Sequence, residues 1–502
     1  MHPQTGDKSR ELALSIDVGT SSARVMLWDT DGHEVEPVRS QRTYRMDTTP
    51  DGGVEMDINS LASHVELCID EALQQAGQLT QNIKLVGIST FWHSCLGIDD
   101  NGGPITPLIS WADRRAGSVI HELKKSLDPK RLHERTGCPL HPSYYPARLA
   151  WLKQSSPSIY KKAARWVSPG EYFFARWFGE KCRNISVSMA SATGLFNQKS
   201  RRWDAETISA LGISEEKLAP IAEENDRVQG LTPSFSARWP ALKEVPFFFP
   251  IGDGACSSIG SGGTDPDTIV INLGTSGAMR VVWDERKNEE PGETPEGLWR
   301  YRVDANRAIA GAAFSDGGIV YEWMLRTLQL PPADQLEREL SSLAPGSGGE
   351  SFLPYLAGER SPGWNPERKA EIAGLTLSSS PLSILQASME GVALQFAWAN
   401  HALKTLFPAN HRISASGGGL GHSPVWAQMF ADVLGCPIQM TEESEASSRG
   451  AALLAMESAG IITVMPAPRA GSLLMPRNEH HYVYKELLSS QLQLYHSKME
   501  TD

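Results

Sequence analysis

The sequence predicts an α/β protein with two large domains, and three observations support this prediction. The chain has 502 residues, more than one hydrophobic core usually serves. A strand, a Gly-Thr-Ser turn and a second strand occur twice, in "SIDVGTSSAR" at 15–24 and in "INLGTSGAMR" at 271–280. Strand and helix patterns alternate after each copy. We therefore expect two α/β domains, 11–250 and 251–480, each opening with the same motif.

The first copy opens an antiparallel β-meander. "ELALSIDVG" alternates in hydrophobicity with the period of a strand. The next strand, "ARVMLWDTDG", ends in Asp31-Gly32, a strong hairpin signal, and "HEVEPVRSQRTYRM" supplies a third strand. Residues 58–76 carry an apolar stripe at helical spacing, and 84–90 form a buried strand that ends at "FWHS". The segment 110–250 is mostly helical by pattern.

The second copy begins another meander at residue 268. "TIVINLG" and "GAMRVVW" predict its first two strands, and "GLWRYRVDANRAIAGAA" predicts one or two more. Helices are expected at 318–330, 381–405 and 424–435, with a Pro/Gly/Ser loop near 344–351. The segment "RISASGGGLG" at 412–421 has the pattern of a strand, a glycine loop and a helix start.

Composition excludes several classes of protein. The net charge is −12 at pH 7, so the chain has no basic excess to bind a nucleic-acid backbone. Its six cysteines are scattered, which is typical of thiols in a reducing cytosol and argues against a disulfide framework or a zinc site. The N-terminal residues lack the apolar core of a signal peptide, and no apolar run is long enough to span a membrane. We expect a cytoplasmic protein.

The repeated turn has the chemistry of a phosphate site. A Gly-Thr-Ser turn directs backbone N–H groups and hydroxyls into one concavity, which suits anionic oxygens. Such turns are more often purely structural. Two of them at the heads of two domains would form a clamp, with Thr20 and Ser21 on one side and Gly274 and Thr275 on the other. Asp17 precedes the first turn where Asn272 precedes the second, so one copy would hold Mg²⁺ and the other the γ-phosphate.

Two further motifs extend this hypothesis. In "ASGGGLGHSP" at 415–424, consecutive glycines between a strand and a helix would let a flat ligand or a phosphate approach the backbone, although a flexible linker is the alternative. Asp253, in "IGDGACS", lies at the predicted domain junction. A carboxylate there could accept the proton of an attacking hydroxyl, whereas a lone Asp before a helix is more often an N-cap.

Together these motifs resemble the FGGY family of carbohydrate kinases, and the resemblance extends from about residue 11 to 460. It implies two ribonuclease H-like domains of the actin, hexokinase and Hsp70 type, a cleft between them, and the use of ATP and Mg²⁺. The matching segments, in chain order, are "DVGTSSAR", "WADRR", "DGACSSIG", "NLGTSGAMR", "FSDGGIVYEW" and "SGGGLGHSPVWAQMFADVLGCPI". Each segment alone is weakly specific, but all six in this order are strongly specific.

The resemblance implies a role for each matched residue. Asp253 is the catalytic base and Asp17 belongs to the metal site. The nucleotide-binding residues are Thr20, Ser21, Arg24, Gly274, Thr275, Gly318, Glu322, Gly418, Gly419 and Ser423. The acceptor-binding residues are Trp92, His93, Trp111 and Asp113, where a structural histidine and a core tryptophan are the alternatives.

Several segments resemble the gluconokinases of this family most, which favours phosphorylation of D-gluconate at its 6-hydroxyl. They are "STFWHSCLGIDDNGGPITPLISWADRRA", "MASATGLFNQKSRRWD" and "YLAGERSPGWNPERKAEIAGL". The carboxylate of gluconate needs a cation or a histidine, and the candidates are Arg114, Arg115, Arg360 and His93. Trp92, Arg148 and Ser383 depart from the family pattern, and Trp92 should reshape the sugar pocket.

Two rival functions remain. One is a kinase for another sugar or polyol, such as xylulose, ribulose, glycerol or erythritol. The other is a nucleotide or sugar sensor without catalysis, against which Asp253 argues, since a sensor does not need a base. The expected partners are ATP and a small sugar or sugar acid, with no nucleic acid and no membrane. Dimers are common in such kinases, but the sequence specifies no dimer surface.

Overall fold

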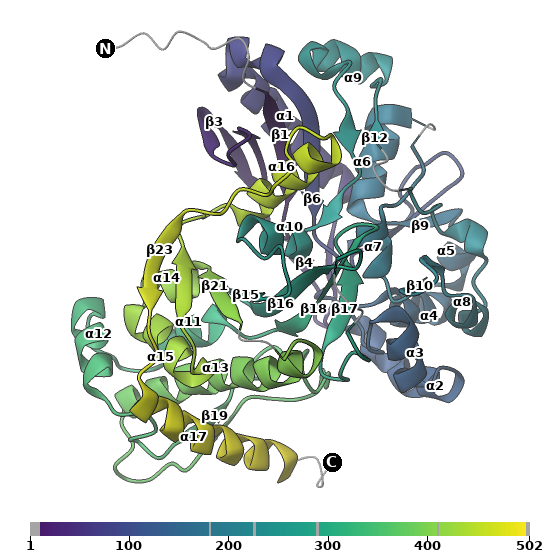
Figure 1. Ribbon diagram of the computed structural model, residues 1–502. Helices are drawn as coiled ribbons and strands as arrows, with labels where there is room; N and C mark the ends of the chain where they lie inside the picture. The colour runs from purple at the N-terminus through teal and green to yellow at the C-terminus, as the bar shows by residue number, and fades with distance from the viewer. Residues whose placement is uncertain (1–10, 180–181, 224–226, 288–290, 409–410, 498–502) are drawn as a thin grey trace, which may run out of the picture.

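The computed structural model describes residues 11–179, 182–223, 227–287, 291–408 and 411–497. The chain forms two lobes, each built on a mixed sheet (Figure 1). The N-terminal sheet has the order β12-β13-β6-β1-β2-β3, with β14 pairing beside β6. Its strands are β1 (Leu12–Val18), β2 (Ser22–Trp28), β3 (Glu34–Thr43), β6 (Ile83–Thr90), β12 (Arg227–Val228), β13 (Phe247–Phe248) and β14 (Ile251–Gly252).

The C-terminal sheet repeats this topology in the order β17-β18-β16-β15-β21-β22-β23. Its strands are β15 (Thr268–Leu273), β16 (Gly277–Asp284), β17 (Trp299–Arg302), β18 (Arg307–Phe314), β21 (Arg412–Ser416), β22 (Ile438–Thr441) and β23 (Ala470–Leu474). In each lobe the first strand pairs antiparallel with the second, and parallel with a later strand: β1 with β2 and β6, and β15 with β16 and β21. The predicted duplication is therefore present.

Helices cover both sheets, and several match their predicted spans. They include α1 (Ile58–Ala76), α6 (Pro169–Phe178), α11 (Gly318–Thr327), α13 (Pro381–Leu406), α15 (Pro424–Leu434) and α17 (Asn478–Ser497). Helix α1 begins where the side chain of Asp57 accepts hydrogen bonds from the backbone N–H groups of Asn59 and Ser60. Its buried stripe includes Leu61 and Val65 and packs on β2 and β3.

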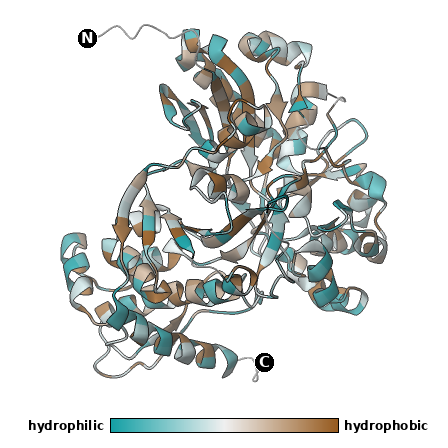
Figure 2. Cartoon of the chain, viewed as in Figure 1, coloured by the Kyte–Doolittle hydropathy of each residue, from teal (hydrophilic) through white to brown (hydrophobic). Residues whose placement is uncertain are grey.

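The segment 110–250 contains α-helices that cover less than half of it, with short strands and irregular stretches between them, so it is less helical than its pattern predicts. Its helices are α2 (Ile120–Ser126), α3 (Pro129–Thr136), α4 (Tyr145–Ser155), α5 (Pro157–Lys162), α6, α7 (Val187–Ser191), α8 (Ala205–Leu211) and α9 (Pro233–Arg238). Figure 2 shows apolar residues concentrated in the strands of both sheets. No helix in the described ranges combines the length and apolarity that crossing a bilayer requires.

Two helices that follow residue 250 connect the lobes. Helix α10 (Asp253–Gly260) and helix α16 (Ala446–Ser458) pack on each other, and α16 also packs on β6 and β1 of the N-terminal sheet. Both lie at the centre of the molecule in Figure 1. Glycines allow the close approach, because a Cβ on Gly450 would lie 1.8 Å from the carbonyl oxygen of Cys256. The division into 11–250 and 251–480 stays a prediction.

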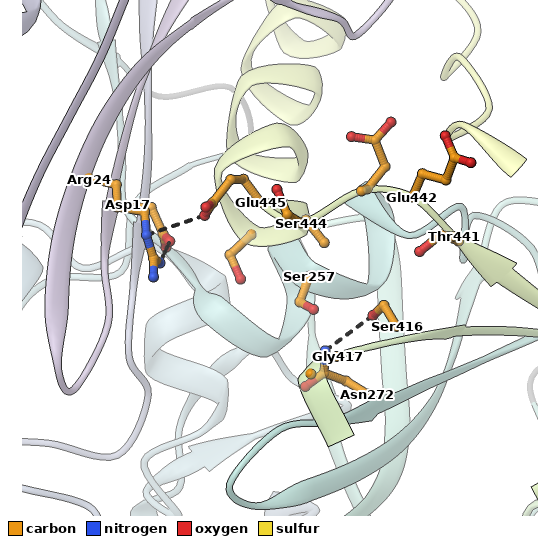
Figure 3. Close-up of a pocket in the computed structure, with 14 residues that line it drawn as sticks. Asp17, Arg24, Ser257, Asn272, Ser416, Gly417, Thr441, Glu442, Ser444 and Glu445 are labelled. Atoms are coloured by element: carbon orange, nitrogen blue, oxygen red, sulfur yellow. Dashed lines mark hydrogen bonds and ion pairs between the residues drawn. The ribbon is translucent and has the colours of Figure 1, made fainter. Parts of the chain in front are cut away.

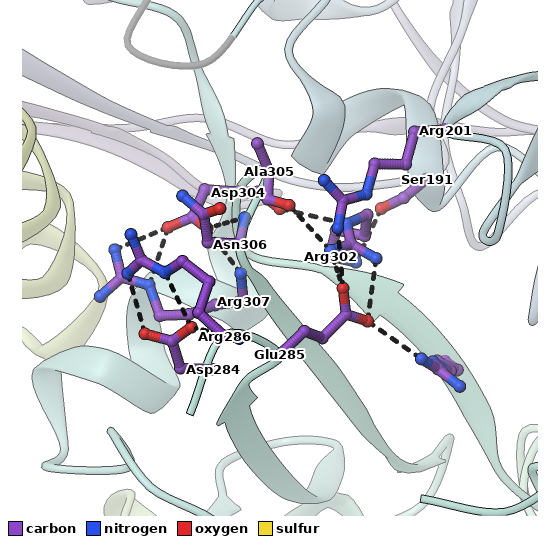
Figure 4. Close-up of polar contacts among 11 residues, drawn as sticks. Ser191, Arg201, Asp284, Glu285, Arg286, Arg302, Asp304, Ala305, Asn306 and Arg307 are labelled. Carbon is purple, nitrogen blue, oxygen red and sulfur yellow. Dashed lines mark hydrogen bonds and ion pairs between the residues drawn. The ribbon is translucent and has the colours of Figure 1, made fainter. Parts of the chain in front are cut away.

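An ion-pair network joins the two lobes near the ends of β16, β17 and β18 (Figure 4). Glu285, the residue after β16, pairs with Arg302 at 2.6 Å and with Arg201 of the N-terminal lobe at 3.0 Å. The backbone N–H of Arg302 donates to Ser191 Oγ at 2.9 Å. Arg307 of β18 pairs with Glu457 of α16 at 2.5 Å. These contacts hold the edge of the C-terminal sheet against the first lobe.

Candidate active site

A cavity of about 400 Å³ lies between the two lobes (Figure 3). Asp17 and Arg24 line it from β1 and β2, and Asn272 lines it from β15. Ser257 of α10 and the segments 416–418 and 441–447 complete the lining. Residues from the strands of both copies of the repeated motif, Asp17, Arg24 and Asn272, therefore face one space. The clamp of Thr20 and Ser21 against Gly274 and Thr275 stays a prediction, because these turn residues are not among those that line the cavity.

The two Gly-Thr-Ser turns are both closed by the N–H of their glycine, but the first loop is one residue longer than the second. The N–H of Gly19 donates to the carbonyl oxygen of Ser22 at 2.9 Å, and that of Gly274 donates to Ser276 at 3.0 Å. Ser21 is exposed and Thr20 is half-buried in the first turn, and Thr275 is exposed in the second. The N–H of Gly318, at the start of α11, donates to Gly274 at 2.7 Å, and a Cβ at Gly318 would lie 2.7 Å from the same oxygen. Gly318 thus permits α11 to start against the second turn.

Asp17 and Asn272 occupy equivalent positions but have different surroundings. Asp17 is buried, and Arg24 Nη1 lies 3.5 Å from its Oδ2. Arg24 also pairs with Glu445 at 3.3 Å. Burial raises the pKa of Asp17 to about 6, and the charges of Asp253 and Glu445 act in the same direction. Asn272 instead donates from Nδ2 to Ser416 Oγ at 3.1 Å.

The acids around Asp17 fit a divalent cation. A buried carboxylate whose pKa is raised by burial and by two other acids gains from a nearby positive charge. Glu445, which sequence reasoning missed, lines the same cavity. The segment 441–445 carries three glutamates and was not distinguishable from a solvated acidic loop.

Asp253 is the first residue of α10, and Gly252 before it is the N-cap. Its Oδ1 accepts a hydrogen bond from the N–H of Gly254 at 2.8 Å. Burial raises the pKa of Asp253, while the charges of Arg280 and Arg360 oppose the rise. The carboxylate therefore lies at the lobe junction, among cations rather than in bulk water, and it is not the cap of its helix.

The glycine loop lies against the first strand of the C-terminal sheet. Gly417 has φ of 107°, and a Cβ there would lie 2.4 Å from the carbonyl oxygen of Leu273, so only glycine fits. Gly418 lines the cavity, and Gly419 lies beside it in the short helix α14 (Gly418–His422). Ser423 is buried and accepts the N–H of Trp426 as the N-cap of α15. Glu322 is exposed on α11.

A second group of predicted residues gathers near Asp253. The ring of Trp92 packs against Gly252 and Gly254, and its indole lies 5.2 Å from the ring of Tyr301. His93 is buried with φ of 63°, and its Nδ1–H donates to the carbonyl oxygen of Ala192 at 2.7 Å. Burial lowers the pKa of His93 well below its usual value, so the ring is neutral and its Nε2 is an acceptor.

The "WADRR" segment divides into residues with different roles. The guanidinium of Arg360 lies 5.0 Å above the ring of Trp111, so Trp111 faces the site. The carboxylate of Asp113 accepts hydrogen bonds from Val54 N at 2.9 Å and from Arg115 Nη2 at 2.7 Å. Those bonds fix the local turn, and acceptor binding by Asp113 stays a prediction.

Of the four candidates for a substrate carboxylate, Arg360 keeps an unpaired donor. Arg115 is bound to Asp113 and to Glu55, and Arg114 donates to the carbonyl oxygen of Pro366 at 2.6 Å. His93 presents an acceptor nitrogen to the site, which suits a hydroxyl and repels a carboxylate. Arg360 Nε is buried without a hydrogen-bond partner in the described structure.

Sequence reasoning missed several side chains in this second group. Arg280 on β16 has buried Nε and Nη1 atoms without partners in the described chain, and its Nε lies 3.2 Å from the position of a Cβ on Gly254. Strand alternation could have found Arg280, because it places this arginine on the same face of β16 as the buried Ala278 and Val282, where a charged residue is unusual. His141 and Tyr301 carried no such signal, since their neighbours here come from distant segments.

Asp316, which follows β18, holds the loop that carries Arg360. We therefore expect its truncation to weaken acceptor binding. Its buried carboxylate accepts the N–H of Ala357 at 3.1 Å, and Ala357 begins the loop that carries Arg360. Burial raises the pKa of Asp316 to about 7. Asp316→Ala should raise the acceptor KM about 10-fold, because one hydrogen bond to a charged group is lost. Asp316→Asn, which keeps an acceptor oxygen, is the control, and equal KM values for both variants would contradict this role.

The two-lobed fold, with Asp17 and Asn272 lining one cavity and Asp253 at the junction, is that of a phosphotransferase that uses an alcohol group as acceptor. The chain belongs to the FGGY family of carbohydrate kinases: the family's N-terminal domain matches residues 12–260 and its C-terminal domain matches residues 269–459. The predicted family and fold class, two lobes of the actin and hexokinase type, are thereby confirmed. Members of this family are ATP-dependent kinases, so ATP is the implied phosphoryl donor.

Known relatives have several acceptors. The chain is 30% identical to a gluconokinase of Bacillus subtilis (strain 168), over 89% of this chain and 88% of that one. It is 28% identical to a glycerol kinase of Citrifermentans bemidjiense, over 90% and 91%. Among solved structures, a gluconate kinase from Lactobacillus acidophilus superimposes with a TM-score of 0.86 at 26% identity, covering 97% of this chain and 98% of that one. A xylulose kinase from the same organism also has a TM-score of 0.86, at 25% identity, covering 97% and 98%.

Proposed function

We propose that the protein transfers the γ-phosphoryl group of ATP to the 6-hydroxyl of D-gluconate, giving 6-phosphogluconate. The observation that supports this acceptor most is the guanidinium of Arg360, whose Nε is buried and unpaired while its charge acts on Asp253. A buried N–H of a charged group without a partner is costly unless a ligand supplies an acceptor, and an anionic oxygen is the strongest one. Gluconokinases among the relatives support the same acceptor.

The residues divide the chemistry between them. Asp253 accepts the proton of the 6-hydroxyl while the hydroxyl oxygen attacks the γ-phosphorus, and ADP leaves. Thr20 and Ser21 of the first turn and Gly274 and Thr275 of the second bind the phosphate oxygens. His93 Nε2 accepts a hydrogen bond from a hydroxyl of the substrate, and Trp111 offers an apolar face to the carbon chain of the substrate.

Mg²⁺ fits the acids on the other side of the cavity. Asp17 would hold the ion with its waters, and Glu445 would contribute further negative charge. When bound, the ion neutralises charge on the phosphates. Arg24 pairs with both carboxylates and would limit their mutual repulsion. Glycines 418 and 419, with Glu322 and Ser423, would surround the nucleoside, and we propose that the enzyme works in the cytoplasm.

The test is ADP release with Mg-ATP and a panel of acceptors: D-gluconate, D-xylulose, D-ribulose, L-ribulose, glycerol and erythritol. Selective turnover of gluconate is the expected result. Turnover of a neutral acceptor without turnover of gluconate would overturn the proposed substrate and favour the second candidate, a kinase for a neutral sugar. The xylulose and glycerol kinases among the relatives support that candidate. The absence of turnover with every acceptor would contradict both.

A further inference from the structure

We propose that His141 and Arg360 together form a subsite for the carboxylate of the acceptor, and that His141 determines specificity for sugar acids over neutral polyols. This inference rests on the proposed function and identifies the groups that read the acid end of the substrate. His141 is buried, and its Nε2 has no hydrogen-bond partner in the described structure. Buried polar atoms are rarely left unpaired, so such an atom at an active site points to a ligand.

The tautomer of His141 follows from its other nitrogen. The backbone N–H of Ser143 donates to Nδ1 at 3.2 Å, so Nδ1 carries a lone pair. Burial, with the charges of nearby arginines, lowers the pKa of His141 to about 3, so the ring is neutral. A neutral ring with a lone pair on Nδ1 carries its proton on Nε2. The unpaired atom is therefore a donor, which suits an anionic oxygen.

The electrostatics around His141 are positive. The charged groups that shift its pKa are all arginines: Arg360, Arg148 and Arg114. Arg148 is buried and donates to the carbonyl oxygens of His93 and Ser110, and Arg114 donates to that of Pro366. Carbonyl oxygens satisfy donors without neutralising charge. Buried surroundings with this surplus of positive charge favour an anion over a hydroxyl group.

The backbone around His141 is strained. Non-glycine residues with positive φ in the described chain are His93, Arg201 and Trp364, and the rings of His93 and Trp364 pack on Tyr144, as does that of His141. Trp364 has φ of 53°, lies 5.4 Å from the ring of His141, and donates its N–H to the carbonyl oxygen of Arg360 at 2.6 Å. This tight turn fixes Arg360 above Trp111. Strain of this kind persists where the surroundings impose it, commonly at ligand sites.

The sheet also positions Arg360. The N–H of Ser361 donates to the carbonyl oxygen of Ala313 at 2.9 Å, and Ala313 pairs with Ala278 across β18 and β16. Arg280 lies two residues further along β16, beside the residue that follows Asp253. Arg280 thus serves the reacting end of the acceptor, and Arg360 with His141 serves the opposite end.

The test compares gluconate with D-glucitol, which carries a neutral CH₂OH in place of the carboxylate. For wild type, His141→Phe and His141→Gln, kcat and KM are measured for both acceptors, and gluconate affinity is measured by calorimetry. Phenylalanine keeps the ring contact with Trp364 but removes the donor. We expect His141→Phe to lower the ratio of kcat/KM for gluconate to that for glucitol about 10- to 100-fold, mainly through KM. His141→Gln, which keeps a donor, should restore most of that ratio.

The control is His401→Phe, which changes an exposed histidine on α13 and should leave every constant unchanged. A fall in kcat/KM that is equal for gluconate and glucitol would overturn the carboxylate subsite while leaving the proposed kinase intact. A wild-type enzyme that phosphorylates glucitol but neither phosphorylates nor binds gluconate would overturn the proposed substrate itself. The two failures are therefore distinguishable.

Discussion

Asp253→Asn is expected to lower kcat by about 10²- to 10⁴-fold, the usual contribution of a positioned general base. The amide keeps an oxygen that can accept the N–H of Gly254, so the start of α10 should be preserved. It cannot accept the proton of the attacking hydroxyl. The KM for ATP should change little, because Asp253 lies at the acceptor side of the junction, among Trp92 and Arg280. Steady-state ADP release, with gluconate as acceptor, measures both constants.

The pH profile gives a second readout of the same residue. Burial raises the pKa of Asp253, and a base must be ionised to accept a proton. The kcat of the wild type should therefore fall as pH falls, at a pH above the ordinary range of an aspartate. Asp267→Asn, at an exposed aspartate, is the matched control and should retain full kcat. Near-normal kcat in Asp253→Asn would remove Asp253 from the mechanism.

Local sequence patterns predicted the fold well because each relied on one physical constraint. The helix at 58–76 coincides with α1, where an aspartate cap and a helical stripe agree. The repeated turns were visible because glycine, threonine and serine recur between two strands of the same period. Asp17 and Asn272 hold equivalent places in the two copies and line one cavity, while the division of metal and γ-phosphate between them stays a prediction.

The acceptor site was predictable only in part because long-range contacts form it. His141 can be identified as a binding residue only from its contact with Trp364 and the nearby charge of Arg360, both more than 200 positions away along the chain. Asp113 and Arg115, which looked like acceptor ligands in a motif, hydrogen-bond to each other. No sequence pattern distinguishes a carboxylate that binds a ligand from one that fixes a turn. Only the partners of each oxygen do so.

Gly450→Val is expected to destabilise the protein by about 3 kcal/mol or more, since overpacking costs most where the neighbour cannot move. A Cβ on Gly450 of α16 would lie 1.8 Å from the carbonyl oxygen of Cys256 in α10. The opposing contact is equally tight, because a Cβ on Gly260 would lie 1.9 Å from the carbonyl oxygen of Ala446. Both obstacles are backbone, so no rotamer change relieves them. Chemical denaturation monitored by tryptophan fluorescence measures the loss.

The same substitution should impair catalysis before it unfolds the chain, because both helices begin at the active site. Helix α10 starts at Asp253, and α16 starts beside Glu445 and Ser447, which line the cavity. Separating the helices would move the base away from the acids around Asp17. Gly292→Val is the control, since open space surrounds that exposed loop glycine far from the site. A Gly450→Val protein with the denaturation midpoint of the wild type would show that the two helices do not require this close contact, and the link between packing and active-site geometry would fail with it.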